Sequence, residues 1–159
     1  SMQDVLRAAH RHQGTSFVEI YQNCNIFNDG AFETLTEKDT KPDTTILLED
    51  GKPLVFGKNR NKGIRLDGFT PTVVNLDDGK YSTSDLLVHN VKFTDPTLAF
   101  IYSQMTENPD LPTPIGVFRA VAKNCYDQDM KTQIAFAKDK AGAGNLTKLL
   151  DQGDTWVVE

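Results

Sequence analysis

Cys24 is the residue whose position in this sequence best suits chemistry. It follows the run Ser16–Tyr21 (SFVEIY), whose mostly apolar, β-prone residues predict a strand. Open α/β sheets place their ligands at the carboxyl ends of strands. Asn23, Asn25 and Asn28 flank the thiol and can turn the chain, and backbone N–H groups close to a thiolate lower its pKa. The local sequence therefore makes Cys24 a candidate ligand or reactive thiol.

The cysteine content also allows a simpler interpretation. Cys24 and Cys125 are too few for a disulfide framework, and neither belongs to a CxxC pair. Two reduced cytosolic thiols, one or both of them buried, would give the same pattern. Their spacing alone does not indicate a metal site.

The remaining polar groups favour structural roles. His10 and His12 are two residues apart on a predicted helix, so they cannot share one face. His89 follows an apolar run, which is typical of a hydrogen-bonded structural histidine. Arg65 and Arg119 lie inside apolar runs, where a guanidinium needs a partner. We expect these two arginines in buried ion pairs or at an interface.

Sequence motifs for several enzyme classes are missing. The chain has no Walker-type loop, GxGxxG, HExxH or GxSxG motif. The carboxylate pairs Asp77-Asp78 and Asp127/Asp129 lie where a turn and a helix start are expected, so general acid–base roles are disfavoured.

Composition indicates a soluble globular protein. The 159 residues are 38% hydrophobic and 25% charged, with a formal net charge of −5. No basic cluster suggests nucleic-acid binding, and no apolar run is long enough to cross a membrane. A secretory signal is not recognisable either, so we expect a cytoplasmic protein.

The elements that must position Cys24 come from the first part of the chain. Apolar spacing predicts a helix over residues 3–12, which the strand 16–21 follows as half of an α/β unit. Residues 31–43 are polar and are expected to form a loop.

Short strands separated by turns are expected in the middle of the chain. They cover residues 44–49, 53–56, 64–66, 71–76 and 86–89, with a hairpin predicted at Asp50-Gly51-Lys52. Asp95 and Pro96 are expected to start a helix that reaches Met105.

The last third is expected to be largely helical. An irregular connection is predicted over residues 109–114, and helices over 127–138 and 145–150, before a final strand or docking tail at Trp156-Val157-Val158. The predicted fold class is therefore α+β.

Six segments resemble the β subunit of 2-oxoacid:ferredoxin oxidoreductases, in order and over most of the chain. The closest similarity is to the two-subunit type assigned to 2-oxoglutarate, although pyruvate or branched oxoacids stay open as substrates. The segments are SFVEIYQNCNIFNDGAF (16–32), GKPLVFG (51–57), KGIRLDGFTPTVV (62–74), DLLVH (85–89), LAFIYSQM (98–105) and PTPIGVFRAV (112–121). One departure is Asn90, where the resemblance leads us to expect an acidic residue after His89.

The resemblance implies a domain organisation. Residues 3–32 would be the last helix, strand and cofactor-side loop of a thiamine-diphosphate domain. Residues 33–159 would be the C-terminal domain of the β subunit, rich in hairpins and ending in helices. Ser1-Met2 looks like a remnant of tag removal, so we expect the natural chain to extend upstream of Gln3.

The resemblance also implies an activity. The family oxidatively decarboxylates a 2-oxoacid to an acyl-CoA and passes the electrons to ferredoxin. Its cofactors are thiamine diphosphate, Mg²⁺ and a [4Fe–4S] cluster. Cys24 matches a late cluster ligand, and Asn23 and Asn28 belong to the loop that lines the cofactor pocket.

The family's GDG…N diphosphate motif and its other cluster cysteines are not in this sequence. We therefore expect the chain alone to be inactive and without bound cofactor. In the intact enzyme the expected partners are the α subunit, ferredoxin, the 2-oxoacid and coenzyme A, in an oligomer. The alternative is a non-catalytic domain for subunit assembly or interaction.

Overall fold

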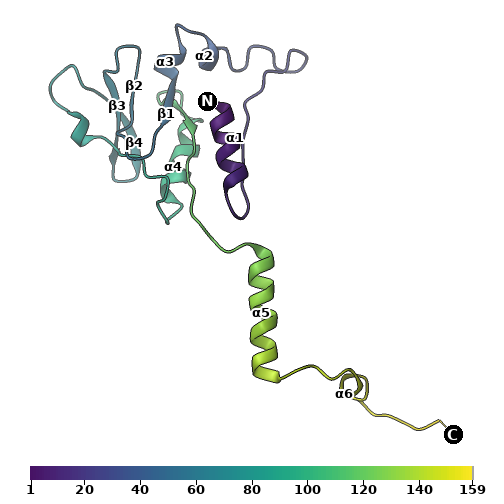
Figure 1. The fold of residues 1–159 in the computed structure, drawn as a ribbon. Helices are drawn as coiled ribbons and strands as arrows, with labels where there is room; N and C mark the ends of the chain where they lie inside the picture. The colour runs from purple at the N-terminus through teal and green to yellow at the C-terminus, as the bar shows by residue number, and fades with distance from the viewer. Residues whose placement is uncertain (159) are drawn as a thin grey trace. The chain divides into compact units, whose positions relative to one another are not determined.

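The computed structural model in Figure 1 describes residues 1–158, which pack as two compact units. The first contains residues 1–12 and 16–122. The second contains residues 13–15 and the chain from Lys123 onward. Each unit is described by itself below.

Helices and short strands alternate in the first unit. Its helices are α1 (Met2–Arg11), α2 (Glu33–Thr36), α3 (Lys41–Thr44), the 3₁₀-helix η1 (Thr83–Asp85) and α4 (Thr97–Met105). Its strands are β1 (Thr45–Leu48), β2 (Val55–Phe56), β3 (Lys62–Asp67), β4 (Thr70–Asn75) and β5 (Thr113–Gly116). Helices and strands of both orientations confirm the predicted α+β class.

The strands form two separate sheets. β1 and β5 pair in parallel, with Thr45 opposite Thr113 and Leu48 opposite Gly116. β2, β3 and β4 form an antiparallel meander in chain order. Asp67-Gly68 lies at the tight turn between β3 and β4, as the sequence predicts.

The hydrophobic core joins both sheets to α4. Its buried members come from β1, the segment before β2, β2, β3 and α4, and they are Ile46, Leu48, Leu54, Phe56, Ile64, Tyr102 and Met105. Burial of these side chains is the main source of stability for the first unit.

His89 is the structural histidine that the sequence predicts. The side chain is 1% exposed, and its Nδ1 lies 3.1 Å from the Tyr102 hydroxyl oxygen. Its Nε2 lies 2.9 Å from the Val117 carbonyl oxygen. Since a carbonyl only accepts, Nε2 carries the proton and Nδ1 accepts from Tyr102. The imidazole thus links the segment after η1 to α4 and to the segment after β5.

Two glycines permit close approaches that a side chain would block. A Cβ on Gly63 in β3 would lie 2.5 Å from the methyl carbons of Leu86. A Cβ on Gly116 in β5 would lie 3.0 Å from the Leu48 carbonyl oxygen, and φ there is +134°. Gly116 therefore requires glycine, because its backbone conformation and the Leu48 backbone both disfavour a side chain, whereas a side chain at Gly63 would force Leu86 to shift.

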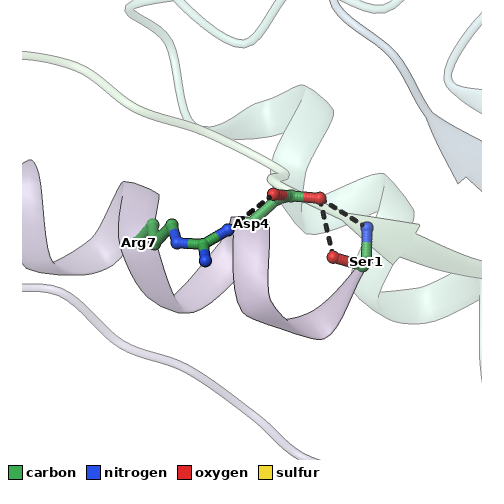
Figure 2. A network of polar contacts seen from close by, with 3 residues as sticks. All are labelled: Ser1, Asp4 and Arg7. Carbon is green, nitrogen blue, oxygen red and sulfur yellow. Dashed lines mark hydrogen bonds and ion pairs between the residues drawn. The ribbon is translucent and has the colours of Figure 1, made fainter.

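Polar contacts fix the first turn of α1, as Figure 2 shows. The Ser1 hydroxyl and the N-terminal ammonium donate to Asp4 Oδ2 at 2.7 and 3.0 Å. Arg7 Nη1 approaches Asp4 Oδ1 at 3.5 Å. The Ser1 hydroxyl is the first cause of the lowered pKa of Asp4. Helix α1 matches the helix predicted over residues 3–12.

The strand predicted over residues 16–21 is wrong. These residues form no strand, and Phe17 and Ile20 are 90% and 55% exposed. An isolated run of β-prone residues gains nothing from an extended conformation unless another strand pairs with it. The α/β unit expected from helix 3–12 and this run is therefore not formed here.

The hairpin predicted at Asp50-Gly51-Lys52 is also wrong. Gly51 has φ of +73° and the chain turns there, but β1 pairs with β5 and β2 pairs with β3. The sequence predicted the turn correctly. It did not predict the strand pairing, because the partner of β1 lies far along the chain.

Smaller corrections concern the loops. The predicted loop 31–43 contains the one-turn helices α2 and most of α3. The predicted irregular stretch 109–114 ends inside β5. The predicted strand 86–89 contributes only an isolated bridge between Val88 and Pro53.

Neither arginine forms the predicted ion pair within residues 1–158. Arg119 donates from Nε to the Phe93 carbonyl at 3.2 Å and from Nη2 to the Thr94 carbonyl at 2.5 Å. The Arg65 guanidinium lies 5.8 Å from the Tyr81 ring centroid. Backbone carbonyls and an aromatic face thus make the direct contacts, while Arg119 and Arg65 act on Asp95 and Asp85 only as charges at longer range.

The second unit contains α5 (Tyr126–Ala141) and α6 (Leu146–Leu150), which confirm two predicted helices. Asn145 caps α6 by accepting from the Lys148 N–H at 2.9 Å. From Lys123 to Val158 no residue is buried, and Cys125 alone is half-buried. Trp156-Val157-Val158, predicted as a strand or docking tail, has no regular structure, and Glu159 lies outside the described residues. Among the described residues, no helix is both long and apolar enough to span a membrane.

Candidate functional site

A short reverse turn holds Cys24. The Asn28 N–H donates to the Cys24 carbonyl at 2.9 Å, and the two residues form an isolated antiparallel bridge. Residues 25–27 make the turn between them. The chain therefore curls around the thiol, as the asparagine-rich sequence predicts.

Asn23 stabilises this turn from outside. Its Nδ2 donates to Asp29 Oδ1 at 2.9 Å, and its Oδ1 accepts from the Gly30 N–H at 3.0 Å. Gly30 has φ of +75°, a conformation that favours glycine. Both polar atoms of Asn23 are thus engaged in shaping the loop.

An aromatic pair closes the loop at its base. The rings of Tyr21 and Phe32 are stacked with their centroids 5.0 Å apart and their planes 2° from parallel. This contact brings together the two ends of the segment that carries Cys24.

The Cys24 thiol is exposed and has a lowered pKa. The backbone N–H of Phe27 is the largest cause, and those of Ile26 and Asn28 act in the same direction. Amide donors stabilise the thiolate over the thiol. Such a thiolate suits nucleophilic attack, oxidation or metal ligation.

Cys24 is the thiolate that this loop offers to a metal. Within residues 1–158, no group of three or more His, Cys, Asp or Glu side chains comes close enough to hold a metal ion. Cys24 fits the ligand role in an iron–sulfur cluster, since a thiolate with amide donors to its sulfur is what such clusters bind. Four such ligands are needed, and one is present.

Exposed apolar side chains follow the thiol directly in the chain. Ile26 and Phe27, two and three residues after Cys24, are 80% and 90% exposed. Sequence reasoning treated residues 25–28 only as turn formers and missed this surface. The signal was available, because two large apolar residues in the middle of a polar turn have no place in a solvated loop.

A concavity in the first unit is lined by residues outside the Cys24 loop. It has a volume of about 260 Å³ and contains an ion pair between Lys62 Nζ and Asp43 Oδ1 at 2.8 Å. The pKa of Asp43 is lowered, and the hydrogen bond from the Lys62 ammonium is the largest cause. None of the lining residues belongs to the Cys24 loop.

Comparison with known proteins gives one informative similarity. The chain is 35% identical over 158 residues to 2-oxoglutarate oxidoreductase subunit KorB of Mycobacterium tuberculosis. The alignment covers 98% of this chain and 42% of the relative, so the chain spans less than half the length of that protein. No family model matches the chain, and no solved structure does. Over nearly its whole length the chain is similar to a 2-oxoglutarate oxidoreductase subunit, which confirms the family resemblance that the sequence predicts.

Proposed function

We propose that this chain is part of the catalytic β subunit of a 2-oxoacid:ferredoxin oxidoreductase, most closely of the 2-oxoglutarate type. Similarity over 98% of the chain to the mycobacterial protein is the observation that carries this proposal. The parent enzyme would be cytoplasmic, convert a 2-oxoacid and coenzyme A to acyl-CoA and carbon dioxide, and reduce ferredoxin. An α subunit would complete the enzyme.

Cys24 is proposed to supply one thiolate to a [4Fe–4S] cluster, whose chemistry is one-electron transfer. The amide groups of Ile26, Phe27 and Asn28 would keep the sulfur deprotonated and adjust its donor strength. The resemblance assigns the remaining ligands to other parts of the same polypeptide. Cys125 has no role in this proposal.

The loop from Asn23 to Asn28 is proposed as one wall of the thiamine-diphosphate pocket. Thiamine diphosphate, with Mg²⁺, would supply the electron sink for decarboxylation. The bonds of Asn23 to Asp29 and Gly30 would hold the wall in shape. The exposed Ile26 and Phe27 would exclude water from its outer side.

The domain assignment is part of the same proposal. Residues 3–32 would belong to the thiamine-diphosphate domain, and residues 33–159 would form the C-terminal domain that covers it. The compact core around Ile64 and Tyr102 supports an independent fold for the larger part of this second region.

The proposal is tested by a matched pair of cysteine variants in the enzyme assembled from full-length subunits. Cys24→Ser should lose most cluster iron and lower 2-oxoglutarate-dependent ferredoxin reduction by at least about 100-fold, because serine is a poor ligand for iron–sulfur clusters. Cys125→Ser should retain both. Iron content, the visible absorbance and the steady-state rate are the measurements.

Equal iron and equal rates in the two variants would remove Cys24 from the ligand set. Normal iron with no turnover on any 2-oxoacid would overturn the proposed reaction while leaving the metal role intact.

A non-catalytic assembly role is the second candidate, and the exposed second unit favours it. Helix α5 and the chain after it have no buried residue. If the β subunit without residues 123–159 assembles poorly but turns over normally once assembled, that part serves assembly alone.

A further inference from the structure

Four turns of the first unit contain the same dipeptide, an aspartate followed by a glycine. The pairs are Asp29-Gly30, Asp50-Gly51, Asp67-Gly68 and Asp78-Gly79. All four glycines have φ between +61° and +75°, so the backbone bends in the same sense at each. Glycine has no side chain to hinder an attack by its own backbone nitrogen. The four pairs therefore share one reactivity and differ in their contacts.

That reactivity is a cyclisation that needs no enzyme, metal or oxidant. The backbone nitrogen of the glycine attacks the carbon of the protonated aspartate carboxyl group. A C–N bond forms, a C–O bond breaks, and the hydroxyl group leaves with the amide proton as water. Water then opens the cyclic imide at either carbonyl, which gives back aspartate or leaves isoaspartate. The glycine nitrogen and the aspartate carboxyl group must both be free to approach each other.

Both groups of the first pair are held by one side chain. Asn23 Nδ2 donates to Asp29 Oδ1 at 2.9 Å, and Asn23 Oδ1 accepts from the Gly30 N–H at 3.0 Å. These two bonds keep the carboxylate and the amide on separate partners, so both must break before the ring can close.

Both groups of the second pair are held by the backbone of a neighbouring segment. The Gly51 N–H donates to the His89 carbonyl at 2.8 Å. Asp50 Oδ1 accepts from the Val91 N–H at 2.9 Å. The buried His89 anchors this segment, so the second pair is as restrained as the first.

The third pair is held at one group only. Asp78 Oδ1 accepts from the Lys80 N–H at 2.9 Å. Among residues 1–158 the Gly79 N–H has no hydrogen-bond acceptor. One bond must therefore break before this pair can react.

The fourth pair is held at neither group. Asp67-Gly68 lies at the turn of the hairpin formed by β3 and β4 (Figure 1). Within the described chain, the Asp67 carboxylate and the Gly68 N–H have no hydrogen-bond partner, and Asp67 is exposed. Asp67 is the last residue of β3 and stands opposite Thr70. The end of a strand opens without unfolding the core, so the two groups can meet by a local motion.

We propose that Asp67-Gly68 is a modification site, at which the chain forms isoaspartate spontaneously and faster than at its three other Asp-Gly pairs. The inference is independent of the proposed enzyme function, since it requires no cofactor, substrate or other subunit. Isoaspartate adds one methylene group to the main chain. The two-residue connection then no longer matches the register of Asp67 with Thr70, so the tip of the hairpin loses its pairing.

Ageing of the 159-residue chain in mildly acidic buffer tests the ranking. Isoaspartyl peptides have the mass of the original peptides but elute separately after digestion, and electron-transfer fragmentation identifies them. Each hydrogen bond that must open should slow the reaction roughly fivefold. Isoaspartate should therefore form fastest at Asp67, roughly fivefold slower at Asp78, and about 25-fold slower at Asp29 and Asp50. In concentrated urea the four rates should converge.

A native rate at Asp67 that is no higher than the rates at Asp29 and Asp50 overturns the proposal. A ranking that persists unchanged in urea also overturns it, because the local sequence and not the folded structure would then set the rates.

Two variants test the cause. Asn23→Ala frees both groups of the first pair, so the rate at Asp29 should rise toward that at Asp67, while the rate at Asp67 stays unchanged. Asp67→Glu is the matched control, because it keeps the charge but would have to close a larger ring, and its hairpin peptide should stay unmodified. Circular dichroism checks that both variants fold. If Asp29 reacts as slowly in Asn23→Ala as in the original chain, the hydrogen bonds do not protect it and the proposed basis of the ranking fails.

Discussion

At the scale of single residues, environment decides what each polar group can do. Cys24 and His89 both follow apolar runs in the sequence. Cys24 is exposed and receives backbone N–H groups, whereas His89 is buried and has both nitrogens engaged. The first is therefore available for chemistry, and the second holds three segments together.

The lowered pKa of Cys24 predicts early alkylation. Since the amides of Phe27 and Ile26 favour the thiolate, the rate of iodoacetamide labelling at Cys24 should reach half its maximum below about pH 8.5, the ordinary thiol value. Peptide mass spectrometry across a pH series measures it. In concentrated urea the turn is lost and the midpoint should rise to the ordinary value. An unchanged midpoint on unfolding would show that the turn does not act on the thiol.

Tyr102→Phe tests the buried link to His89. The substitution keeps the ring but leaves His89 Nδ1 without its donor, in a site where both side chains are almost inaccessible. An unsatisfied buried acceptor should lower the free energy of unfolding by about 1–3 kcal/mol. Urea denaturation measures it, and Tyr126→Phe, at an exposed tyrosine, should cost less than about 0.5 kcal/mol. Equal stability of the two variants would argue against the link.

At the scale of elements, the sequence predicted those turns and helix starts that are fixed by residues close together in the chain. Asp95 accepts from the Thr97 N–H at 2.8 Å, but the helix starts at Thr97 with Pro96 as its N-cap residue, so Asp95 lies one position before the cap instead of at it. Asp67-Gly68 turns between two strands that pair with each other. By contrast, the run 16–21 needs a partner strand, and β1 has its partner in β5. No local pattern contains that information.

Gly63→Ala tests the close packing of β3. The new methyl group would meet Leu86, which is 5% exposed and has little room to move. Overpacking should destabilise the first unit by about 1–3 kcal/mol. Gly144→Ala, where nothing lies within 4 Å, should change stability by less than about 0.5 kcal/mol. Thermal or urea unfolding followed by circular dichroism distinguishes them, and a neutral Gly63→Ala would show that Leu86 yields freely.

At the scale of the whole molecule, the two units differ in what holds them. The first has a core that joins two sheets and α4, whereas the second has no buried side chain among its described residues. Helices of this length without a packed face are marginal in water. The sequence predicted both helices of the second unit correctly, but it could not show that they lack a core, because burial depends on contacts across the fold.

Hydrogen exchange should reveal this difference. Amides of β3 should be protected by several orders of magnitude, because they open only when the core unfolds, whereas amides of α5 should exchange close to the unfolded rate in dilute solution. Mass spectrometry of peptic fragments measures both. Similar protection in α5 and β3 would contradict the absence of a core around α5.

Only part of the candidate site could be predicted from the sequence, because only some of its features are local. Cys24 could be singled out from the chain, because a cysteine in an asparagine-rich turn is a local feature. The engagement of Asn23 with Asp29 and Gly30 could not be predicted, since it depends on how the loop closes. The apolar cover of Ile26 and Phe27 is visible in the sequence only when exposure is known.

The parallel pairing of β1 with β5 has a consequence for biosynthesis. All of residues 49–112 lie between the two strands, so a ribosome delivers β1 long before its partner. At roughly 5–20 residues per second this interval lasts about 3 to 13 s. Throughout that time the apolar sequence Thr45–Leu48 has no strand beside it. The nascent chain therefore passes through a stage in which β1 is open to chaperones and to aggregation, and the stage ends only when β5 emerges.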